Sequence, residues 1–246
     1  MNIKNLSVLF SVVTFAALIL GACSPAAQGD DPTLIVKAFY DAFNEGDIEK
    51  AMSLTAEDYV MNDPFGTYNR ADAEIQWQAV FDAGLTFNQT NFVHTGNGRV
   101  TSCYEVFENG TSIDKGCGNV THVVGGKIVY DGLENAEQIW VVKEYYEALN
   151  AGNFDSAMGF VASDAVFINP TGTYEGADAI RESLEGLVKD GITFNLSNFR
   201  NTDGTVVYDY EVLQGGNVLD KGTNGLTQVR DGLVIFDGTE ETLPSR

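Results

Sequence analysis

Histidine and cysteine, the residue types that most often bind transition metals, are scarce in this 246-residue chain, which has two histidines and three cysteines. Its two histidines, His94 and His122, lie in different segments, and neither belongs to a carboxylate cluster with the spacing of metal ligands. A metal centre needs several such ligands converging on one point. The sequence therefore predicts no metal site, and nothing in it indicates a cofactor.

Cys103 and Cys117 lie symmetrically about Gly110, in a stretch whose pattern predicts a β-hairpin. Opposite positions on paired strands bring Cβ atoms within about 4.5–5.5 Å, which is the range of a disulfide. The spacing is not that of a C-x-x-C redox motif, and the second copy of the pattern described below does without these cysteines. We therefore expect a structural disulfide.

Asp63 begins the sequence Asp63-Pro64-Phe65-Gly66. A carboxylate beside apolar walls can move a proton when burial raises its pKa. An aspartate before a proline is also a common turn residue, because its side chain hydrogen-bonds the local backbone. Asparagine serves a turn equally well, and the corresponding position later in the chain is Asn169. Both interpretations of Asp63, acid/base group and turn residue, stay open at this point.

The elements that must position these residues occur twice. The run from Val36 to Asp47 returns 106 positions later as Val142 to Asn153, and Asp131-Gly132 returns as Asp237-Gly238. This period is far longer than that of a solenoid repeat, and each copy is long enough for a core of its own. The sequence therefore predicts two whole domains in tandem.

Each copy begins with helices and ends with strands. Asp31-Pro32 predicts the N-cap and first turn of a helix, because apolar residues at helical spacing follow it. Further helices are expected over about 71–83 in the first copy and over 137–150, 154–161 and 177–189 in the second. Strands are expected at 59–61, 85–92, 99–108, 111–124 and 127–131, with equivalents in the second copy. This order predicts an α+β domain with helices on one face of a sheet.

The first 22 residues are not expected to belong to the fold. Lys4 precedes an apolar run, Leu6 to Leu20, that is too short for a comfortable membrane span. The run ends Leu20-Gly21-Ala22-Cys23, which resembles the lipobox of bacterial lipoproteins, where the cysteine carries the lipid; the alternative is an ordinary secretory signal. We expect residues 1–22 to be a signal peptide and 23–33 a lipidated tether. The protein is then exported and anchored to the bacterial cell envelope through Cys23, in the outer membrane if the organism has one.

The formal net charge of the chain is −21. A nucleic-acid-binding surface needs a basic stripe that neutralises phosphates, and the sequence has none. Nucleic acid is therefore not an expected partner. The acidity is that of a solvated surface.

Four features follow one another in the first copy: a helix that ends F-N-E-G-D (43–47), the segment A-E-D-Y-V-M-N-D-P-F-G (56–66), a third helix and a hairpin-rich sheet. This order resembles the SnoaL-like, or nuclear transport factor 2-like, superfamily. The resemblance implies two tandem cone-shaped α+β domains, each with three helices packed on a strongly bent, mostly antiparallel sheet around an apolar pocket. It covers residues 34–132 and 139–246, with a linker at 133–138.

Within that superfamily, the D-P-F-G segment is similar to the motif of ketosteroid isomerase, which implies a general acid/base role for Asp63. The same resemblance requires a tyrosine on the first helix and a protonated aspartate in the sheet. The first copy has Phe39 at the tyrosine position and the second has Asn169 in place of the base, so neither set is complete. Thr121 and Thr227 stand at the place of the sheet aspartate. The residues predicted to line the pockets are Tyr40, Trp77, Tyr104, Tyr145, Tyr146, Asn169 and Tyr210.

The incomplete catalytic sets predict a non-catalytic envelope module that binds a small apolar molecule or a partner protein. The alternative is a SnoaL-like enzyme that uses Asp63 as general acid/base, with the second domain as scaffold. Single-domain members of the superfamily pair through their sheets. The two copies are therefore expected to form a pseudo-dimer within one chain.

Overall fold

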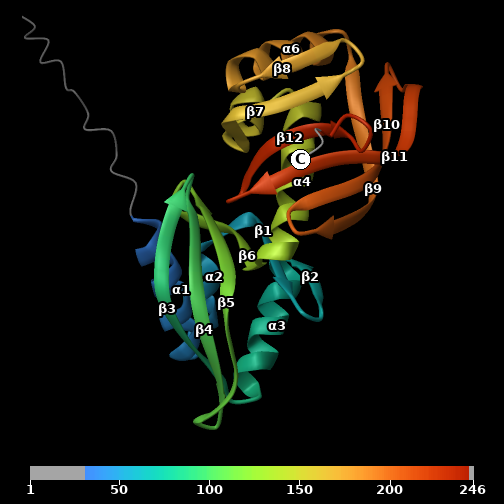
Figure 1. The fold of residues 1–246 in the computed structure, drawn as a ribbon. Coiled ribbons are helices and arrows are strands. Elements are labelled where there is room, and N and C mark those ends of the chain that lie inside the picture. The colour runs from blue at the N-terminus through green and yellow to red at the C-terminus, as the bar shows by residue number, and fades with distance from the viewer. Residues whose placement is uncertain (1–30, 244–246) are drawn as a thin grey trace, which may run out of the picture.

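The structure is a computed structural model, and it describes residues 31–243 (Figure 1). The predicted signal peptide (1–22), the predicted lipidation site Cys23 and most of the predicted tether lie outside the described residues. Within residues 31–243, no helix is both long enough and apolar enough to cross a membrane.

Domain 1 runs from the first helix to the sixth strand. Its helices are α1 (Pro32–Asn44), α2 (Ile48–Ser53) and α3 (Arg70–Asp82), and its strands are β1 (Thr55–Asp63), β2 (Gly66–Asn69), β3 (Leu85–Gly96), β4 (Arg99–Glu108), β5 (Thr111–Val124) and β6 (Lys127–Leu133).

Domain 2 repeats this order of elements. Its helices are α4 (Glu134–Asn150), α5 (Phe154–Gly159) and α6 (Ala177–Lys189), and its strands are β7 (Val161–Asn169), β8 (Gly172–Glu175), β9 (Ile192–Thr202), β10 (Thr205–Gln214), β11 (Asn217–Arg230) and β12 (Leu233–Thr239).

The two sheets have the same topology. Domain 1 orders its strands β2-β1-β6-β5-β4-β3, and domain 2 orders them β8-β7-β12-β11-β10-β9. The first and last long strands of each domain, β1 with β6 and β7 with β12, pair in parallel, and all other neighbours are antiparallel. Register shifts interrupt most of these pairs, and such bulges bend a sheet. The α+β fold with two tandem, mostly antiparallel domains is confirmed.

Local sequence explains where the helices begin. Asp31 caps α1, with its Oδ1 accepting a hydrogen bond from the Thr33 N–H at 3.0 Å, and Pro32 stands in the first turn, as predicted. Asp47 caps α2 in the same way. Helix α4 has no side-chain cap, so contacts with domain 1 must hold its first turn.

Some boundaries differ from those predicted. Strand β1 begins at Thr55 rather than near residue 59, and the four-residue strands β2 and β8 are too short for alternation to show in the sequence. Helix α4 begins at Glu134, directly after β6, so residues 133–138 form the end of that strand and the first helical turn. The polar residues of this turn carry no apolar periodicity, which is why the pattern indicated a later start.

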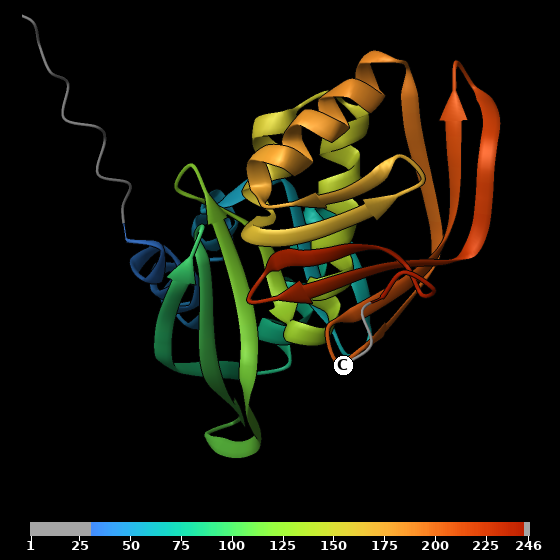
Figure 2. The same cartoon turned by 45° about the horizontal axis from the view of Figure 1, so that its top comes forward.

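The two domains meet at α4, which contacts β5 and β6 of domain 1 (Figures 1 and 2). Tyr130 of domain 1 belongs to the buried hydrophobic cluster of domain 2, and Val60 and Val129 pack against that cluster. Trp140 of α4 lies 4.8 Å from Tyr130, measured between ring centroids. The contact between the domains is therefore a helix on a sheet face.

Candidate functional site

A buried carboxyl group lies inside each domain. In domain 1 the carboxyl of Asp131, on β6, is 3% exposed. Tyr40 of α1 donates to its Oδ2 at 2.9 Å, and Thr121 of β5 donates to its Oδ1 at 2.8 Å. Asn119 adds a longer hydrogen bond to Oδ1 at 3.2 Å.

Domain 2 builds the same arrangement at the equivalent positions. Tyr146 donates to Oδ2 of Asp237 at 2.8 Å, and Thr227 donates to its Oδ1 at 2.8 Å. A second tyrosine, Tyr208 of β10, donates to Oδ1 at 3.1 Å and contacts the hydroxyls of Tyr146 and Thr227.

Burial dominates the electrostatics of both clusters. It raises the pKa of Asp131, against the lowering effect of hydrogen bonds from Thr121 and Tyr40. It raises the pKa of Asp237 to about 6 against similar hydrogen bonds. These carboxyl groups therefore hold their protons at higher pH than exposed aspartates do.

Beside these clusters, three neighbouring positions carry different residues in the two domains. Domain 2 has Tyr208 on β10 where domain 1 has Ser102, and the strand partner of this position is Gly225 rather than Asn119. A Cβ at Gly225 would overlap the Tyr208 ring, so the glycine makes room for the tyrosine. The tyrosine of domain 1 comes instead from β1, as Tyr59, where domain 2 has Ala165.

Two polar atoms of domain 1 lack a partner. Tyr59 is 1% exposed and Trp77 is 7% exposed, and neither the Tyr59 Oη nor the Trp77 Nε1 makes a hydrogen bond of normal geometry to any described residue. Burial and the nearby Asp131 raise the pKa of Tyr59, and the neighbouring Trp77 N–H opposes this. Both groups are hydrogen-bond donors in an aromatic surrounding, because the Trp77 ring lies 4.7 Å from Phe43 and 5.7 Å from Phe87, measured between centroids.

The counterpart of Trp77 is Leu184. Domain 2 gains one residue, Gly176, just before α6, so Trp77 and Leu184 stand at the same place in α3 and α6, and both are buried. Domain 2 therefore has no nitrogen at this position. The two interiors differ in polarity as well as in shape.

Asp63 lies in the turn between β1 and β2. Its Oδ1 accepts hydrogen bonds from the N–H groups of Phe65 at 2.7 Å and Gly66 at 2.9 Å. Asn169 makes the equivalent bonds to Thr171 and Gly172 at 2.8 and 3.2 Å. Both side chains hold the same turn, and the structure does not bring Asp63 into hydrogen-bond contact with the buried Asp131 cluster.

The remaining predicted pocket residues lie in different surroundings. Tyr145 is buried in the core of domain 2, 4.9 Å from the Tyr146 ring, at the position of Phe39. Tyr104 and Tyr210 lie partly exposed on the hairpins β4–β5 and β10–β11. The Tyr104 hydroxyl approaches Asp114, and the Tyr210 hydroxyl approaches Asp220, each at 3.4 Å. The structure thus brings Tyr40, Trp77, Tyr145 and Tyr146 into the two interiors but leaves Tyr104 and Tyr210 on the hairpins.

The predicted disulfide between Cys103 and Cys117 is confirmed. It joins paired positions of β4 and β5. Domain 2 has Asp209 at the place of Cys103, where Asn198 donates to it at 2.6 Å. This hydrogen bond joins β9 to β10 and corresponds to the contact of Asn91 with Cys103 in domain 1, whereas Thr223 stands at the place of Cys117, so domain 2 has no counterpart of the disulfide.

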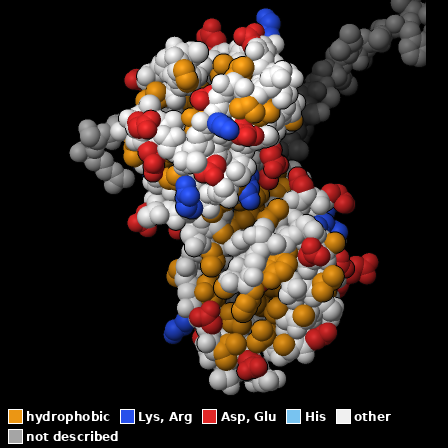
Figure 3. Space-filling view, turned by 90° about the vertical axis from the view of Figure 1, so that its right-hand side faces the viewer, with side chains coloured by type: hydrophobic (Ala, Val, Ile, Leu, Met, Phe, Trp, Pro, Cys, Tyr) orange, Lys and Arg blue, Asp and Glu red, His pale blue; other side chains and the backbone are white. Residues whose placement is uncertain are grey.

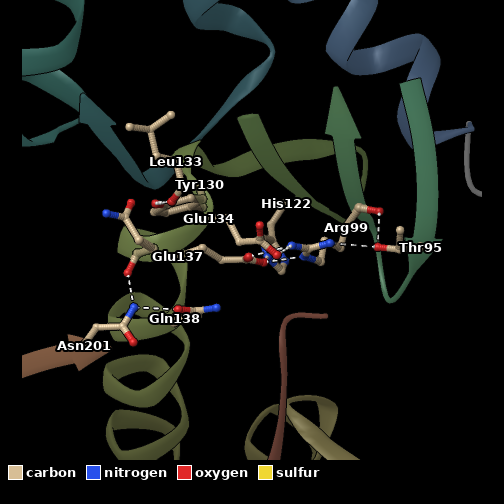
Figure 4. A network of polar contacts seen from close by, with 10 residues as sticks. Thr95, Arg99, His122, Tyr130, Leu133, Glu134, Glu137, Gln138 and Asn201 are labelled. Carbon is tan, nitrogen blue, oxygen red and sulfur yellow. Dashed lines mark hydrogen bonds and ion pairs between the residues drawn. The ribbon is translucent and has the colours of Figure 1, made fainter. Parts of the chain in front are cut away.

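A second polar cluster joins the domains (Figure 4), and its central members, Arg99, His122 and Glu137, are buried, while Glu134 approaches Arg99 at 3.5 Å from the exposed side. Glu137 of α4 receives two hydrogen bonds from Arg99 of β4, at 2.6 and 2.8 Å, and lies 2.5 Å from Nε2 of His122 of β5. Burial would raise the pKa of Glu137, but the hydrogen bonds from His122 and Arg99 lower it. Gly232 of domain 2 covers the cluster so closely that a Cβ there would lie 2.8 Å from Arg99. We call these three residues the interdomain triad.

An open cleft lies beside the interdomain triad, on the side of Trp140. It consists of two adjoining hollows of about 730 and 350 Å³, and Asp58, Trp140 and Glu144 line both. Burial, together with Glu147 and Asp58, raises the pKa of Glu144 to about 7. Volumes of this size suit small organic molecules.

Comparison with known proteins decides the family. The sequence profile of the SnoaL-like domain matches residues 36–130 and again residues 142–237, which together make up most of the chain. The chain belongs to the SnoaL-like domain family. A comparison with curated proteins found no match.

Solved structures resemble single SnoaL-like domains of this chain. A nuclear transport factor 2-like protein of unknown function from Cytophaga hutchinsonii is 18% identical and covers 42% of this chain and 88% of its own, with a TM-score of 0.37. An epoxide hydrolase-like protein from M. tuberculosis is 18% identical over 42% of this chain and 81% of its own, with a TM-score of 0.35. A putative polyketide cyclase from Sinorhizobium meliloti is 16% identical over 39% of this chain and 90% of its own, with a TM-score of 0.34.

Sequence reasoning missed the buried carboxyl groups of the two SnoaL-like domains. The signal was present, because Asp131-Gly132 returns as Asp237-Gly238 and both aspartates interrupt buried strands. It also missed the interdomain triad, because two of its three members have no charged counterpart in the other copy: Thr205 stands for Arg99 and Gln228 for His122, while Glu137 corresponds to Asp31. Comparing the two copies finds only residues that both copies have, and the residues of an interface between the copies need not occur in both.

Proposed function

We propose that this chain is a non-catalytic binding module whose domain 1 holds a small, mainly apolar molecule that carries a hydrogen-bond acceptor. The observation that carries this proposal is the pair of buried, unpartnered donors, Tyr59 Oη and Trp77 Nε1. An unpartnered buried polar group costs about 1–3 kcal/mol, so an occupant with an acceptor oxygen would recover that free energy. The aromatic rings around Trp77 provide the apolar wall.

Domain 2 supports the assignment by contrast. Its Tyr208 hydroxyl is fully engaged with Tyr146, Thr227 and Asp237, and it has Ala165 and Leu184 at the positions of the two free donors. The cluster around Tyr208 is thus satisfied by its own side chains, and the two buried unpartnered atoms of domain 2, Asn169 Nδ2 and Asn201 Oδ1, lie elsewhere, at the end of β7 and on β9. Ligand binding is therefore assigned to domain 1, with domain 2 as its structural partner.

A matched pair of probes tests this proposal. We expect 2-acetylnaphthalene, which has a carbonyl acceptor, to bind the soluble chain more tightly than 2-ethylnaphthalene, measured by isothermal titration calorimetry. Tyr59→Phe removes one donor hydroxyl and should weaken binding of the ketone about fivefold, as expected for one hydrogen bond, without affecting the hydrocarbon.

Tyr145→Phe serves as the control, because it makes the same chemical change in domain 2 and copies Phe39. It should leave binding of the ketone unchanged. Equal affinities for ketone and hydrocarbon, or no saturable binding of either, would contradict the proposal. If a water molecule were the occupant between Tyr59 and Trp77, neither probe would show saturable binding.

A partner protein is the other occupant that the sequence predicts. Hydrophobic side chains gather on the face of domain 1 shown in Figure 3. Phe65, in the β1–β2 turn, is 90% exposed, and Ile75 of α3 is also exposed. Their counterparts, Thr171 and Glu182, are polar. Loss of a co-purifying protein on Phe65→Thr, with the probes still bound, would assign the partner to this surface.

The enzymatic alternative uses Asp63 as general acid/base. What supports it is that the turn engages Oδ1 of Asp63, while Oδ2 makes no hydrogen bond to a described residue. Asp63→Asn keeps the turn, because Asn169 holds the same turn in domain 2. It should therefore abolish any turnover while leaving folding and probe binding intact. A turnover activity that survives this substitution would remove Asp63 from the mechanism.

We further propose that the protein is exported and anchored by a lipid on Cys23. The Cys103–Cys117 disulfide supports export, because disulfides persist in oxidising compartments. The expected result is incorporation of labelled fatty acid into the full chain and its loss on Cys23→Ala. Membrane fractionation that leaves both forms soluble would overturn the anchor.

A further inference from the structure

The cleft between the domains has an aromatic floor. Trp140 lies between its two hollows, and Phe160 of domain 2 lies 5.7 Å from it, measured between ring centroids. Tyr130 of domain 1 closes one side, and Phe199 of domain 2 lines the larger hollow. These rings come from both domains, so the cleft exists only in the two-domain chain.

Carboxylates surround this floor, and the groups that favour the ionised form of Glu144 are the Trp140 N–H and the charge of Lys143. Asp58 of β1 and Glu144 and Glu147 of α4 line the cleft, and none of them forms an ion pair with another described residue. The lysine that lines the cleft, Lys143, lies over the Phe199 ring at 5.1 Å. Glu144 is partly buried, and a carboxylate removed from water without a counter-ion is unfavourable.

The copies show that Trp140 and Glu144 are particular to the cleft. Trp140 corresponds to Leu34 of α1, which is exposed, and Glu144 corresponds to Ala38. Helix α1 thus carries neither the ring nor the carboxylate at these positions. Two of the three residues that line both hollows are therefore not part of the shared domain pattern, whereas Asp58 is kept in domain 2 as Asp164.

We propose that this cleft is a binding site for an organic cation, whose ammonium group lies against the Trp140 ring and beside Glu144 and Asp58. An ammonium over an aromatic face is attracted by the ring quadrupole, and most strongly by tryptophan. The carboxylates supply the counter-charge, and the apolar walls accept the substituents on nitrogen. This site is separate from the interior of domain 1, so it stands or falls independently of the proposed function.

Choline and its neutral isostere 3,3-dimethylbutan-1-ol test the site, because they differ in charge at one atom. We expect choline to bind the two-domain chain about tenfold more tightly, measured by isothermal titration calorimetry at pH 8. Between pH 6 and 8 the choline affinity should rise by up to about tenfold, because Glu144 ionises in this range. Asp58, Glu147, Lys143, Tyr130 and His122 also face the cleft, so a variant must assign the pH dependence.

Glu144→Gln keeps the shape of the side chain and removes its charge. It should weaken choline binding about tenfold at pH 8 and flatten the pH profile, while 3,3-dimethylbutan-1-ol is unaffected. Glu182→Gln, on the exposed face of α6, makes the same change outside the cleft and should change nothing. Equal affinities for the two probes, a Glu144→Gln variant that binds like the unmodified chain, or no saturable choline binding would each overturn the proposal.

Discussion

Asp237→Asn should stabilise the protein at neutral pH, although it alters a buried hydrogen-bonded residue. The pKa of Asp237 is raised to about 6 by burial, above the 3.8 of an exposed aspartate. The folded state therefore holds this proton more tightly than the unfolded state does. The contribution of Asp237 to stability is fully present below about pH 4 and is lost as the pH rises through about 6.

The difference between the two pKa values sets the magnitude. At about 1.4 kcal/mol for each pKa unit, it corresponds to about 3 kcal/mol lost between pH 4 and pH 8. Asparagine has the shape of a protonated aspartate and stays neutral. Its Oδ1 still accepts from Thr227 and Tyr208, and its amide donates to the Tyr146 hydroxyl, whose own proton turns to the Tyr208 oxygen 3.2 Å away. The variant should thus keep the stability that the unmodified chain loses.

Urea unfolding at pH 4 and pH 8 measures this effect. At each pH, the free energy of unfolding of the unmodified chain is subtracted from that of Asp237→Asn. This difference should be more positive at pH 8 than at pH 4 by about 3 kcal/mol. Asp164→Asn, at an exposed position of β7, should show no such change between the two pH values. A difference that is the same at both pH values, or that falls at pH 8, would refute the argument that burial governs this carboxyl.

Three further perturbations test the packing. Glu137→Gln removes the buried counter-charge of Arg99 and leaves it the exposed Glu134 at 3.5 Å, which should cost about 3 kcal/mol and divide thermal unfolding in calorimetry into two transitions; one undivided transition would contradict the coupling of the domains through Glu137. Gly225→Ala places a methyl group against the Tyr208 ring and should lower the free energy of urea unfolding by about 2 kcal/mol, whereas no loss would show that the ring has room to move. Reduction of Cys103–Cys117, which are 14 residues apart, should lower the free energy of unfolding by about 3 kcal/mol, and a chain equally stable when reduced would contradict a structural role.

The fold could be predicted because the same local signals occur twice. Asp31-Pro32 and Asp47 mark helix starts in the way that capping chemistry requires, and the structure uses both. The cysteines indicated the register of β4 and β5, which the disulfide confirms. Short strands and the first turn of α4 escaped prediction, because tertiary contacts form them.

The candidate sites were less predictable, because each depends on which side chain completes a cluster. Tyr40 lies one residue after the position that the resemblance indicated, yet it is Tyr40 that hydrogen-bonds Asp131. The helix presents this residue to the sheet, and the phase of a helix against a sheet is set by packing. Likewise, nothing in the spacing of Arg99, His122 and Glu137 indicates that they meet, since two of them lie on strands of one domain and the third on a helix of the other.

The two domains share the buried carboxyl cluster but differ in the aromatic ring that packs beside it. Both domains keep an aspartate with a tyrosine and a threonine, and a buried, hydrogen-bonded carboxyl of this kind fixes the position of the first helix against the last two strands. The ring that fills the remaining space comes from β10 in domain 2, as Tyr208, but from β1 in domain 1, as Tyr59. Only the former finds hydrogen-bond partners among the described residues. The conserved cluster therefore explains the shared fold, whereas the ring that changed strand explains why a ligand is expected in one domain and not in the other.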